Sequence, residues 1–151
     1  MLRKALAALE AHIAAHIQAC EALARKAALM RSVKGIGPST VAVLLAYMPE
    51  PGTFSRASAA CMAGAAPFGD KSGKASLPSP IEAGRAAVRK ALYRAALVAI
   101  RYNPAMRAFA DRLTRSGKCA KLVIAAVMRK RIVTLNAMLK AAEPWKGPHT
   151  A

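Results

Sequence analysis

The stretch at residues 33–42 constrains the fold most, because it places a Gly-x-Gly turn between two apolar helical patterns. Apolar residues recur three and four positions apart before this turn and again after it, a spacing typical of helices that bury one side. Pro38 stands where the first turn of a helix tolerates a missing N–H. The sequence therefore predicts two helices joined by a short glycine turn.

This turn, within residues 30–48, resembles the helix-hairpin-helix element of many DNA-handling proteins. Its glycines permit positive φ, and without Cβ atoms they let a nucleic acid strand approach. The helix that follows offers unpaired N–H groups and a positive dipole end to an anion. We predict DNA contacts from four residues here: Lys34, Gly35, Gly37 and Ser39. The alternative is a glycine turn between two core helices, or a contact between proteins.

The charge of the chain favours a polyanionic partner. Lys and Arg number 24 against 7 Asp and Glu, which gives a formal charge of +17. The positive residues are spread along the chain, so they predict a basic surface on a folded body and not a basic arm. We expect steep weakening of nucleic-acid binding by salt. Charge alone does not separate DNA from RNA.

Composition and periodicity together favour helices throughout. Hydrophobic residues make up 55% of the chain but aromatic residues only 5%, so alanine carries much of the apolar content. No stretch alternates convincingly with period two. We predict an all-α fold with a long N-terminal heptad helix, then the helix-hairpin-helix, then a small helical bundle. The expected divisions are an arm at residues 1–29, a helical domain at residues 30–145 and a tail at residues 146–151.

The N-terminal helix is expected to need a partner. From residue 2 to residue 30, apolar positions alternate four and three apart, which is the seam of a coiled coil. One helix cannot bury this stripe alone, so it must pack on another copy, on another domain or on the rest of the chain. We expect a homo-oligomer. The sequence has neither a membrane span nor a signal-peptide block, and its three isolated cysteines suit a reducing compartment, so we expect a cytoplasmic protein.

The remaining helices can be placed by their breaks. Ser55 is a plausible N-cap of a short helix, and residues 68–84 form a long loop. Further helices are predicted at residues 83–102, 105–115 and 118–142, separated by Asn-Pro and Ser-Gly. In the last of them we expect Leu122 to lie inward and Arg131 to belong to an exposed basic shoulder.

The long loop holds the candidate nucleophile. Ser72 is flanked by Lys71, Gly73 and Lys74. A serine that attacks a phosphodiester needs cationic groups that stabilise the negative charge of the phosphate, and room for close approach. The lysines and the glycine beside Ser72 would serve both needs. The alternative is an ordinary loop serine in a solvent-facing turn. The acidic residues form no cluster suited to two-metal chemistry, so we expect no metal or other cofactor in this chain.

Several motifs in order resemble one family. They are Ser-Val-Lys-Gly-Ile-Gly-Pro from residue 32, Gly-Ala-Ala-Pro from residue 64, Lys-Ser-Gly-Lys from residue 71, Arg-Lys-Ala-Leu-Tyr from residue 89 and Arg-Tyr-Asn-Pro from residue 101. This order is similar to the C-terminal domain of the insertion sequence 110/116/902-type transposases, the bridge-RNA-guided recombinases. Those proteins pair a resolvase-like nuclease domain with a serine-bearing domain, joined by a coiled-coil arm.

The resemblance implies a role for each part. It makes Ser72 the nucleophile of DNA strand exchange, through a phosphoserine link, in transposition of an insertion sequence. It places Mg²⁺ on acidic residues of the nuclease domain, which have no counterpart here, and makes DNA, a structured guide RNA and full-length transposase subunits the partners. We add Arg85 and Arg89 to the predicted DNA contacts, although Glu82 and Arg85 replace the lysine and asparagine of the family pattern. The alternative functions are a truncated, non-catalytic DNA-binding fragment, or a module whose glycine turn and arm only dock proteins.

Overall fold

The computed structural model describes residues 1–48, 52–64 and 85–146, and all regular elements in these ranges are α-helices. The all-α prediction is confirmed. In chain order the helices are α1 (Leu2–Ala19), α2 (Glu21–Arg31), α3 (Pro38–Tyr47), α4 (Arg56–Met62), α5 (Ala86–Tyr102), α6 (Pro104–Arg115) and α7 (Ala120–Ala141). None of these helices is long and apolar enough to cross a bilayer.

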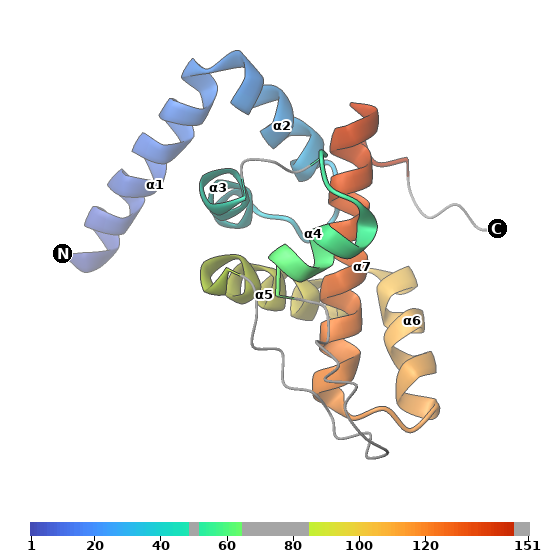
Figure 1. The fold of residues 1–151 in the computed structure, drawn as a ribbon. Coiled ribbons are helices and arrows are strands. Elements are labelled where there is room, and N and C mark those ends of the chain that lie inside the picture. Colours follow the sequence, from blue (N-terminus) through green and yellow to red (C-terminus); the bar gives the residue numbers. More distant parts are fainter. Residues whose placement is uncertain (49–51, 65–84, 147–151) are drawn as a thin grey trace.

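Helix α7 forms the axis of the bundle, and α2, α4, α5 and α6 all pack against it (Figure 1). Helix α5 supplies the other large share of the core. Five of its residues form the buried side: Val88, Leu92, Ala95, Ala96 and Ala99. Most of these are small, which lets α5 approach α7 closely and leaves little room for change at either helix.

The predicted inward side of the last helix is wrong at Leu122. Leu122 is 47% exposed, whereas Val123 and Val127 are buried. Residues 122–128 are all apolar, so the pattern fits either phase, and packing in the bundle decides which side faces the core. The same rotation carries Arg131 inward, and this side chain is only 3% exposed instead of forming a basic shoulder.

The predicted continuous N-terminal helix is also wrong, because it breaks at Cys20. This residue is extended, with φ −109° and ψ 113°, and separates α1 from α2. Helix α2 buries Ala27 and Met30 in the core, while α1 folds back to contact α3 (Figure 1). A straight helix could not reach both places. The division predicted between residues 29 and 30 falls within α2, which packs against α3 and α7.

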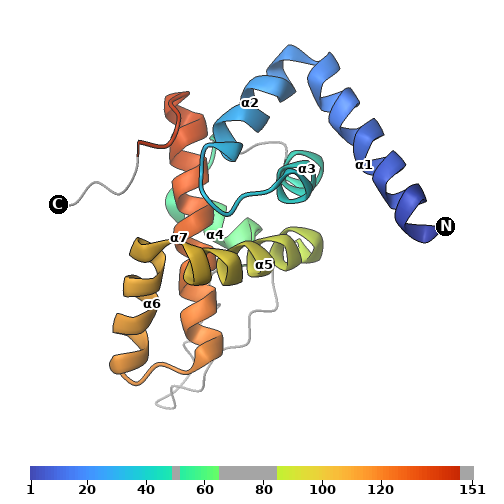
Figure 2. The ribbon, with the colours of Figure 1, turned by 180° about the vertical axis from the view of Figure 1, so that it is seen from behind.

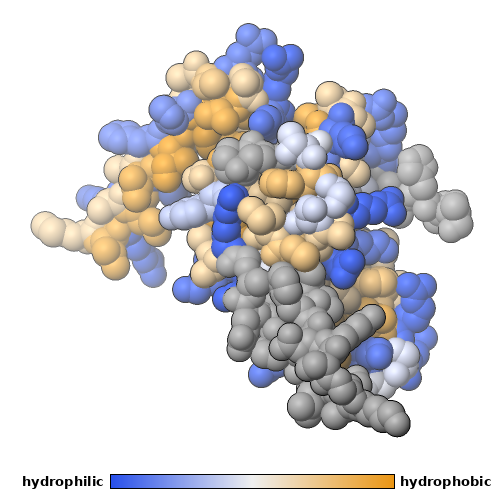
Figure 3. All heavy atoms as spheres, in the orientation of Figure 1, coloured by the Kyte–Doolittle hydropathy of each residue, from blue (hydrophilic) through white to orange (hydrophobic). Residues whose placement is uncertain are grey.

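Helix α1 has no buried residue and keeps an apolar side. Leu2, Leu6, Leu9 and Ile13 are exposed along it, and Figure 3 shows apolar residues gathered along α1. The coiled-coil pairing of this side stays a prediction.

Two helix starts carry the caps that their sequences suggest. The Ser55 Oγ accepts a hydrogen bond from the Ser58 N–H at 3.1 Å. The Asn103 Oδ1 accepts from the Ala105 N–H at 3.0 Å, immediately after α5 ends. Because each cap satisfies an N–H that the helix leaves unpaired, it defines where the helix begins. Except for Lys146, the predicted tail at residues 146–151 lies outside the described residues.

Candidate nucleic-acid interface

The turn between α2 and α3 runs beside α7 (Figure 2), and residues on its inner side hold it in place. Val33 and Ile36 are both buried, and Lys34 between them is exposed. Behind the turn, Ser32 Oγ donates to the Leu29 carbonyl at 2.7 Å and accepts from the Trp145 N–H at 3.0 Å. Two apolar side chains and one serine therefore fix the turn, and the predicted contact residue Lys34 is left pointing outward.

The two glycines of the turn differ in conformation, and only Gly35 uses the positive φ that we expected of both. Gly35 has φ +85°, but a Cβ there would lie 3.2 Å from Arg131 Nη2 and 3.6 Å from Val98 Cγ1. Gly35 thus faces the body of the protein. Gly37 has φ −88°, which any residue can adopt, and a Cβ there would meet nothing within 4 Å. Only Gly37 presents an open backbone to solvent.

Arg131 of α7 lies directly beneath the turn. Its Nη2 donates to the Lys34 carbonyl at 2.7 Å, and its Nε has no hydrogen-bond partner. Burial lowers the pKa of Arg131 from its ordinary value to about 10, so the side chain still carries its charge at pH 7. None of the ion pairs found within the described residues includes Arg131. The fold therefore keeps an uncompensated cation behind the glycine turn, at a cost of about 3 kcal/mol.

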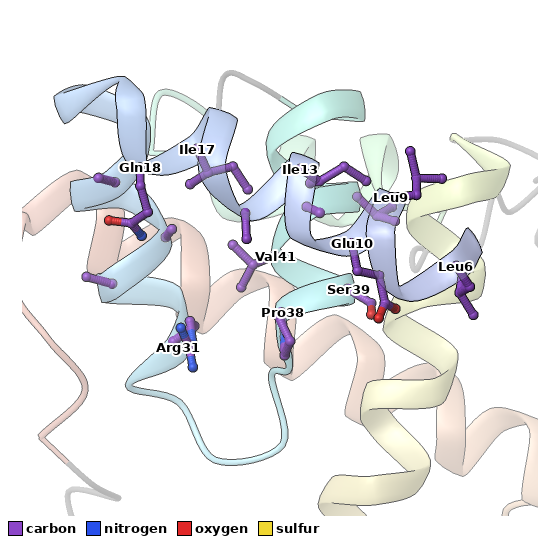
Figure 4. A pocket seen from close by; sticks show the side chains of 16 residues that line it. Leu6, Leu9, Glu10, Ile13, Ile17, Gln18, Arg31, Pro38, Ser39 and Val41 are labelled. Atoms are coloured by element: carbon purple, nitrogen blue, oxygen red, sulfur yellow. The ribbon is translucent and has the colours of Figure 1, made fainter. Parts of the chain in front are cut away.

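The N-terminus of α3 faces outward. Gly37 is the N-cap, no side chain caps the helix, and Pro38 and Ser39 are exposed. The first N–H groups of α3 thus lack helical partners at the positive end of its dipole. Figure 4 shows Glu10 of α1 pointing toward Ser39, and both residues line a groove of about 570 Å³ between α1 and α3. Glu10 is the acidic group that an incoming phosphate would meet at this groove.

The second predicted group lies at the start of α5. The Arg85 Nη1 donates to the Tyr47 carbonyl at the end of α3, so this guanidinium supports the fold. Arg89 lines an open hollow together with Lys90, Tyr93 and Arg94. The three cationic side chains can bind phosphates, and the half-exposed ring of Tyr93 can stack against an unpaired base.

The structure does not bring the two predicted groups together. Gly35 contacts Val98 and Ala99 near the end of α5, whereas Arg85 precedes its first residue. The intervening helix spans about 20 Å at 1.5 Å per residue. The predicted contacts thus form two separate surfaces, one at the glycine turn and one at the start of α5.

Ser72, Lys71, Gly73 and Lys74 lie outside the described residues. The described chain on either side of them is informative, because the Arg85 N–H donates to the Met62 carbonyl at 3.1 Å. The segment that carries Ser72 therefore leaves and re-enters the bundle at nearly the same point, beside the start of α5.

Sequence reasoning missed three contributors. Arg131 was assigned by its charge, although its spacing from Val127, Met128 and Leu135 already placed it on the buried side of α7. A further basic cluster surrounds Phe109 of α6, with Lys130 Nζ 4.5 Å and the Arg112 guanidinium carbon 5.4 Å from the ring centre. Its cross-helix contact between α6 and α7 carried no signal in the sequence. Lys90, Tyr93 and Arg94 were passed over, although their spacing put them on the solvent side of α5.

Within the residues described, no three His, Cys, Asp or Glu side chains gather closely enough to hold a metal ion. The four acidic residues in these ranges come from α1, α2, α6 and the chain after α7: Glu10, Glu21, Asp111 and Glu143. They do not form the clustered oxygen ligands that Mg²⁺ would need.

Comparison with known proteins bears on the same residues. The family model described as "Transposase IS116/IS110/IS902 family" matches residues 27–111, which include the glycine turn, the Ser72 segment and α5. A pilin gene-inverting protein of Moraxella lacunata is 32% identical over 124 residues, covering 80% of this chain and 38% of that protein. Its namesake from Moraxella bovis is 32% identical over 127 residues, covering 82% and 39%. The chain thus spans about two fifths of the length of these curated relatives, and it belongs to the IS116/IS110/IS902 transposase family.

Proposed function

We propose that this chain binds DNA and supplies a serine nucleophile for strand exchange in transposition. Membership of the transposase family supports a role in DNA recombination. The observation that carries the binding part is the glycine turn, where Gly37 and the start of α3 lie open above the buried charge of Arg131. A phosphate group at this place would accept hydrogen bonds from backbone N–H groups. It would be attracted both by the positive end of the α3 dipole and by the charge of Arg131.

A substitution at Gly37 tests the binding part without disturbing the fold. Asp is a better N-cap than Gly, and the site has room for a side chain, so Gly37→Asp should leave the free energy of unfolding unchanged or raise it by a few tenths of a kcal/mol. The same carboxylate would occupy the N–H groups and repel a phosphate. We expect duplex DNA affinity to fall about tenfold in fluorescence anisotropy.

Gly37→Asn is the matched control, because Asn caps a helix equally well and carries no charge. It should lose much less affinity than Gly37→Asp. Equal DNA binding by the wild type and Gly37→Asp would mean that the turn serves only protein docking or packing.

The chemical step assigned to Ser72 is a transesterification. Its Oγ forms a bond to phosphorus while the bond from phosphorus to one bridging sugar oxygen breaks. The serine loses its proton and the departing oxygen takes one up, so one phosphoester replaces another. The linked DNA end can then be passed to a second strand by the reverse step. The basic residues at the start of α5 would hold the phosphate near this segment.

Further components belong to this proposal. The acidic residues described here do not fit Mg²⁺, so we place the metal and its ligands in a nuclease domain of a full-length transposase subunit, and we derive no step through it. A structured guide RNA would select the DNA. The exposed apolar side of α1 would pair with a second subunit.

Trapping the covalent link tests Ser72. A nicked DNA substrate that loses its leaving strand should yield a protein–DNA adduct that runs on a denaturing gel at the mass of this 15.8 kDa chain plus the linked strand. The assay includes a guide RNA and full-length subunits whose own serine is replaced by alanine. Ser72→Ala should abolish the adduct, whereas the control substitutions Ser76→Ala and Ser79→Ala should retain it. An adduct that persists in Ser72→Ala would remove Ser72 from the mechanism, and DNA binding with no adduct from the wild type would favour a non-catalytic DNA-binding fragment.

A further inference from the structure

Arg131 poses a question that packing alone does not answer. Its side chain is 3% exposed, and it uses Nη2 for one hydrogen bond to the Lys34 carbonyl. Its Nε is buried without a partner. A neutral donor could make the same bond without the cost of desolvating a charge. The retained charge therefore needs a second explanation.

We propose that Arg131 is a positioning residue that supplies, from inside the bundle, the positive charge of a phosphate site at the glycine turn. The inference rests on the proposed function, because it names the charge that makes this turn bind a nucleic-acid phosphate. Arg131 does not touch the ligand. It holds the turn through the Lys34 carbonyl and attracts the anion through the turn.

The contact at Gly35 makes this action possible. Because Gly35 has no side chain, the guanidinium lies against the backbone of the turn, with Nη2 3.2 Å from the place of a Cβ. Val98 and Ala99 of α5 border the same position, and Ala99, which is 1% exposed, closes its inner side. On the outer side, Gly37 and Ser39 are exposed. One layer of backbone thus separates a desolvated cation from solvent, and its field is weakly screened in that direction.

The start of α3 adds its own positive end at the same place. The helix has ten residues, no side-chain cap and no acidic residue in its own first turn, and the acidic group that faces it is Glu10 of α1, which points toward Ser39. A fixed cation and a helix dipole that act on one anion reinforce each other. We expect removal of the charge at position 131 to weaken phosphate binding about tenfold, as for an ion pair separated by roughly 8 Å at an effective dielectric constant near 30.

The experiment separates charge from hydrogen bonding. Inorganic phosphate is titrated into the wild type and the variants Arg131→Lys, Arg131→Gln and Arg131→Met, and binding is followed by the amide NMR shifts of Gly37 and Ser39. Lys retains the charge, Gln retains a neutral donor and Met retains neither. Arg131→Lys should keep phosphate affinity within about threefold of the wild type, while Arg131→Gln and Arg131→Met should both lose about tenfold.

Thermal unfolding of each variant separates this effect from folding. Gln and Met both remove the charge, so either one that unfolds cooperatively suffices for the comparison. Arg129→Gln is the control, since Arg129 is exposed on the same helix and should change phosphate binding at the turn by less than twofold. Wild-type affinity in a folded Arg131→Gln protein, or a folded Arg131→Lys protein that binds as weakly as Arg131→Gln, would overturn the inference.

A failure of the proposed function would look different. In that case phosphate and duplex DNA would leave the Gly37 and Ser39 amides of the wild type unshifted, and Gly37→Asp would not change DNA affinity. If the wild type binds at the turn and the charge at position 131 has no effect, only the role of Arg131 is lost.

Discussion

Gly35 and Gly37 stand two residues apart, yet the structure uses their missing side chains in opposite directions. At Gly35, Arg131 packs where a side chain would begin, and at Gly37 the same position is open to solvent. The sequence placed the turn correctly, but the motif Gly-x-Gly does not determine the φ of each glycine or the residues that pack against it. Arg131 lies nearly a hundred residues further along the chain, so local pattern could not show that it packs there.

Gly35→Ala should destabilise the protein more than Gly117→Ala. Both glycines have φ above +80°, which costs a side chain roughly 1–2 kcal/mol, but a Cβ at position 117 meets nothing within 4 Å. A Cβ at position 35 must also displace the Arg131 guanidinium. We expect Gly35→Ala to lower the free energy of unfolding by about 1 kcal/mol more than Gly117→Ala in urea titrations. Equal losses would show that Arg131 yields freely at the turn.

At the scale of helices, apolar periodicity predicts the buried side well where all the large apolar side chains lie on one side of a helix. In α3 and α5, Val41, Leu44 and Leu92 are buried, and bulky residues at this spacing leave a single phase possible. The phase of α7 was missed because residues 122–128 are all apolar, so the pattern marks no single inward side there. The heptad pattern of α1 and α2 continued through Cys20 without a break signal. There the competition between two packing surfaces ended the helix, and sequence periodicity does not record that competition.

Asn136 of α7 shows how a polar residue attaches a short element to the bundle. Its Oδ1 accepts from the Gly52 N–H at 2.7 Å, and its Nδ2 donates to the Phe54 carbonyl at 2.9 Å. These two bonds fix the chain just before α4. Asn136 is 4% exposed, so neither backbone group has ready access to water if the side chain is removed.

Asn136→Leu should therefore cost about 2–4 kcal/mol, because it leaves a donor and an acceptor unpaired in a partly buried place. Thermal unfolding followed by circular dichroism measures the change. The neighbouring exposed residue provides the control, and Ala137→Leu should change stability by less than about 0.5 kcal/mol. A loss for Asn136→Leu no larger than for Ala137→Leu would mean that the attachment is not needed.

For the whole molecule, the main consequence is that the basic residues are divided between two surfaces. The turn and the start of α5 lie at different ends of α5, and a DNA strand must extend about 20 Å to contact both. Sequence reasoning supplied both groups and the sign of the charge. The distance between the glycine turn and the start of α5 could not be predicted from the sequence, because it depends on how α3 packs across α5.

The division predicts how salt acts on DNA binding. If each surface neutralises about three phosphates, the plot of log affinity against log salt concentration should have a slope of about −5. Arg94→Gln at the α5 surface should reduce this slope by about one, and its effect on affinity should add to that of Gly37→Asp, because the two residues share no partner. Anisotropy titrations between 50 and 300 mM salt would measure both, a range set by roughly physiological ionic strength. A slope near zero would contradict binding through phosphates at these surfaces.

The hydrogen bond from the Arg85 N–H to the Met62 carbonyl closes the bundle on itself at the base of the segment that carries Ser72. The two ends of that segment are therefore held next to each other by the bundle itself. We therefore expect insertions in that segment to change the stability of the helical bundle little.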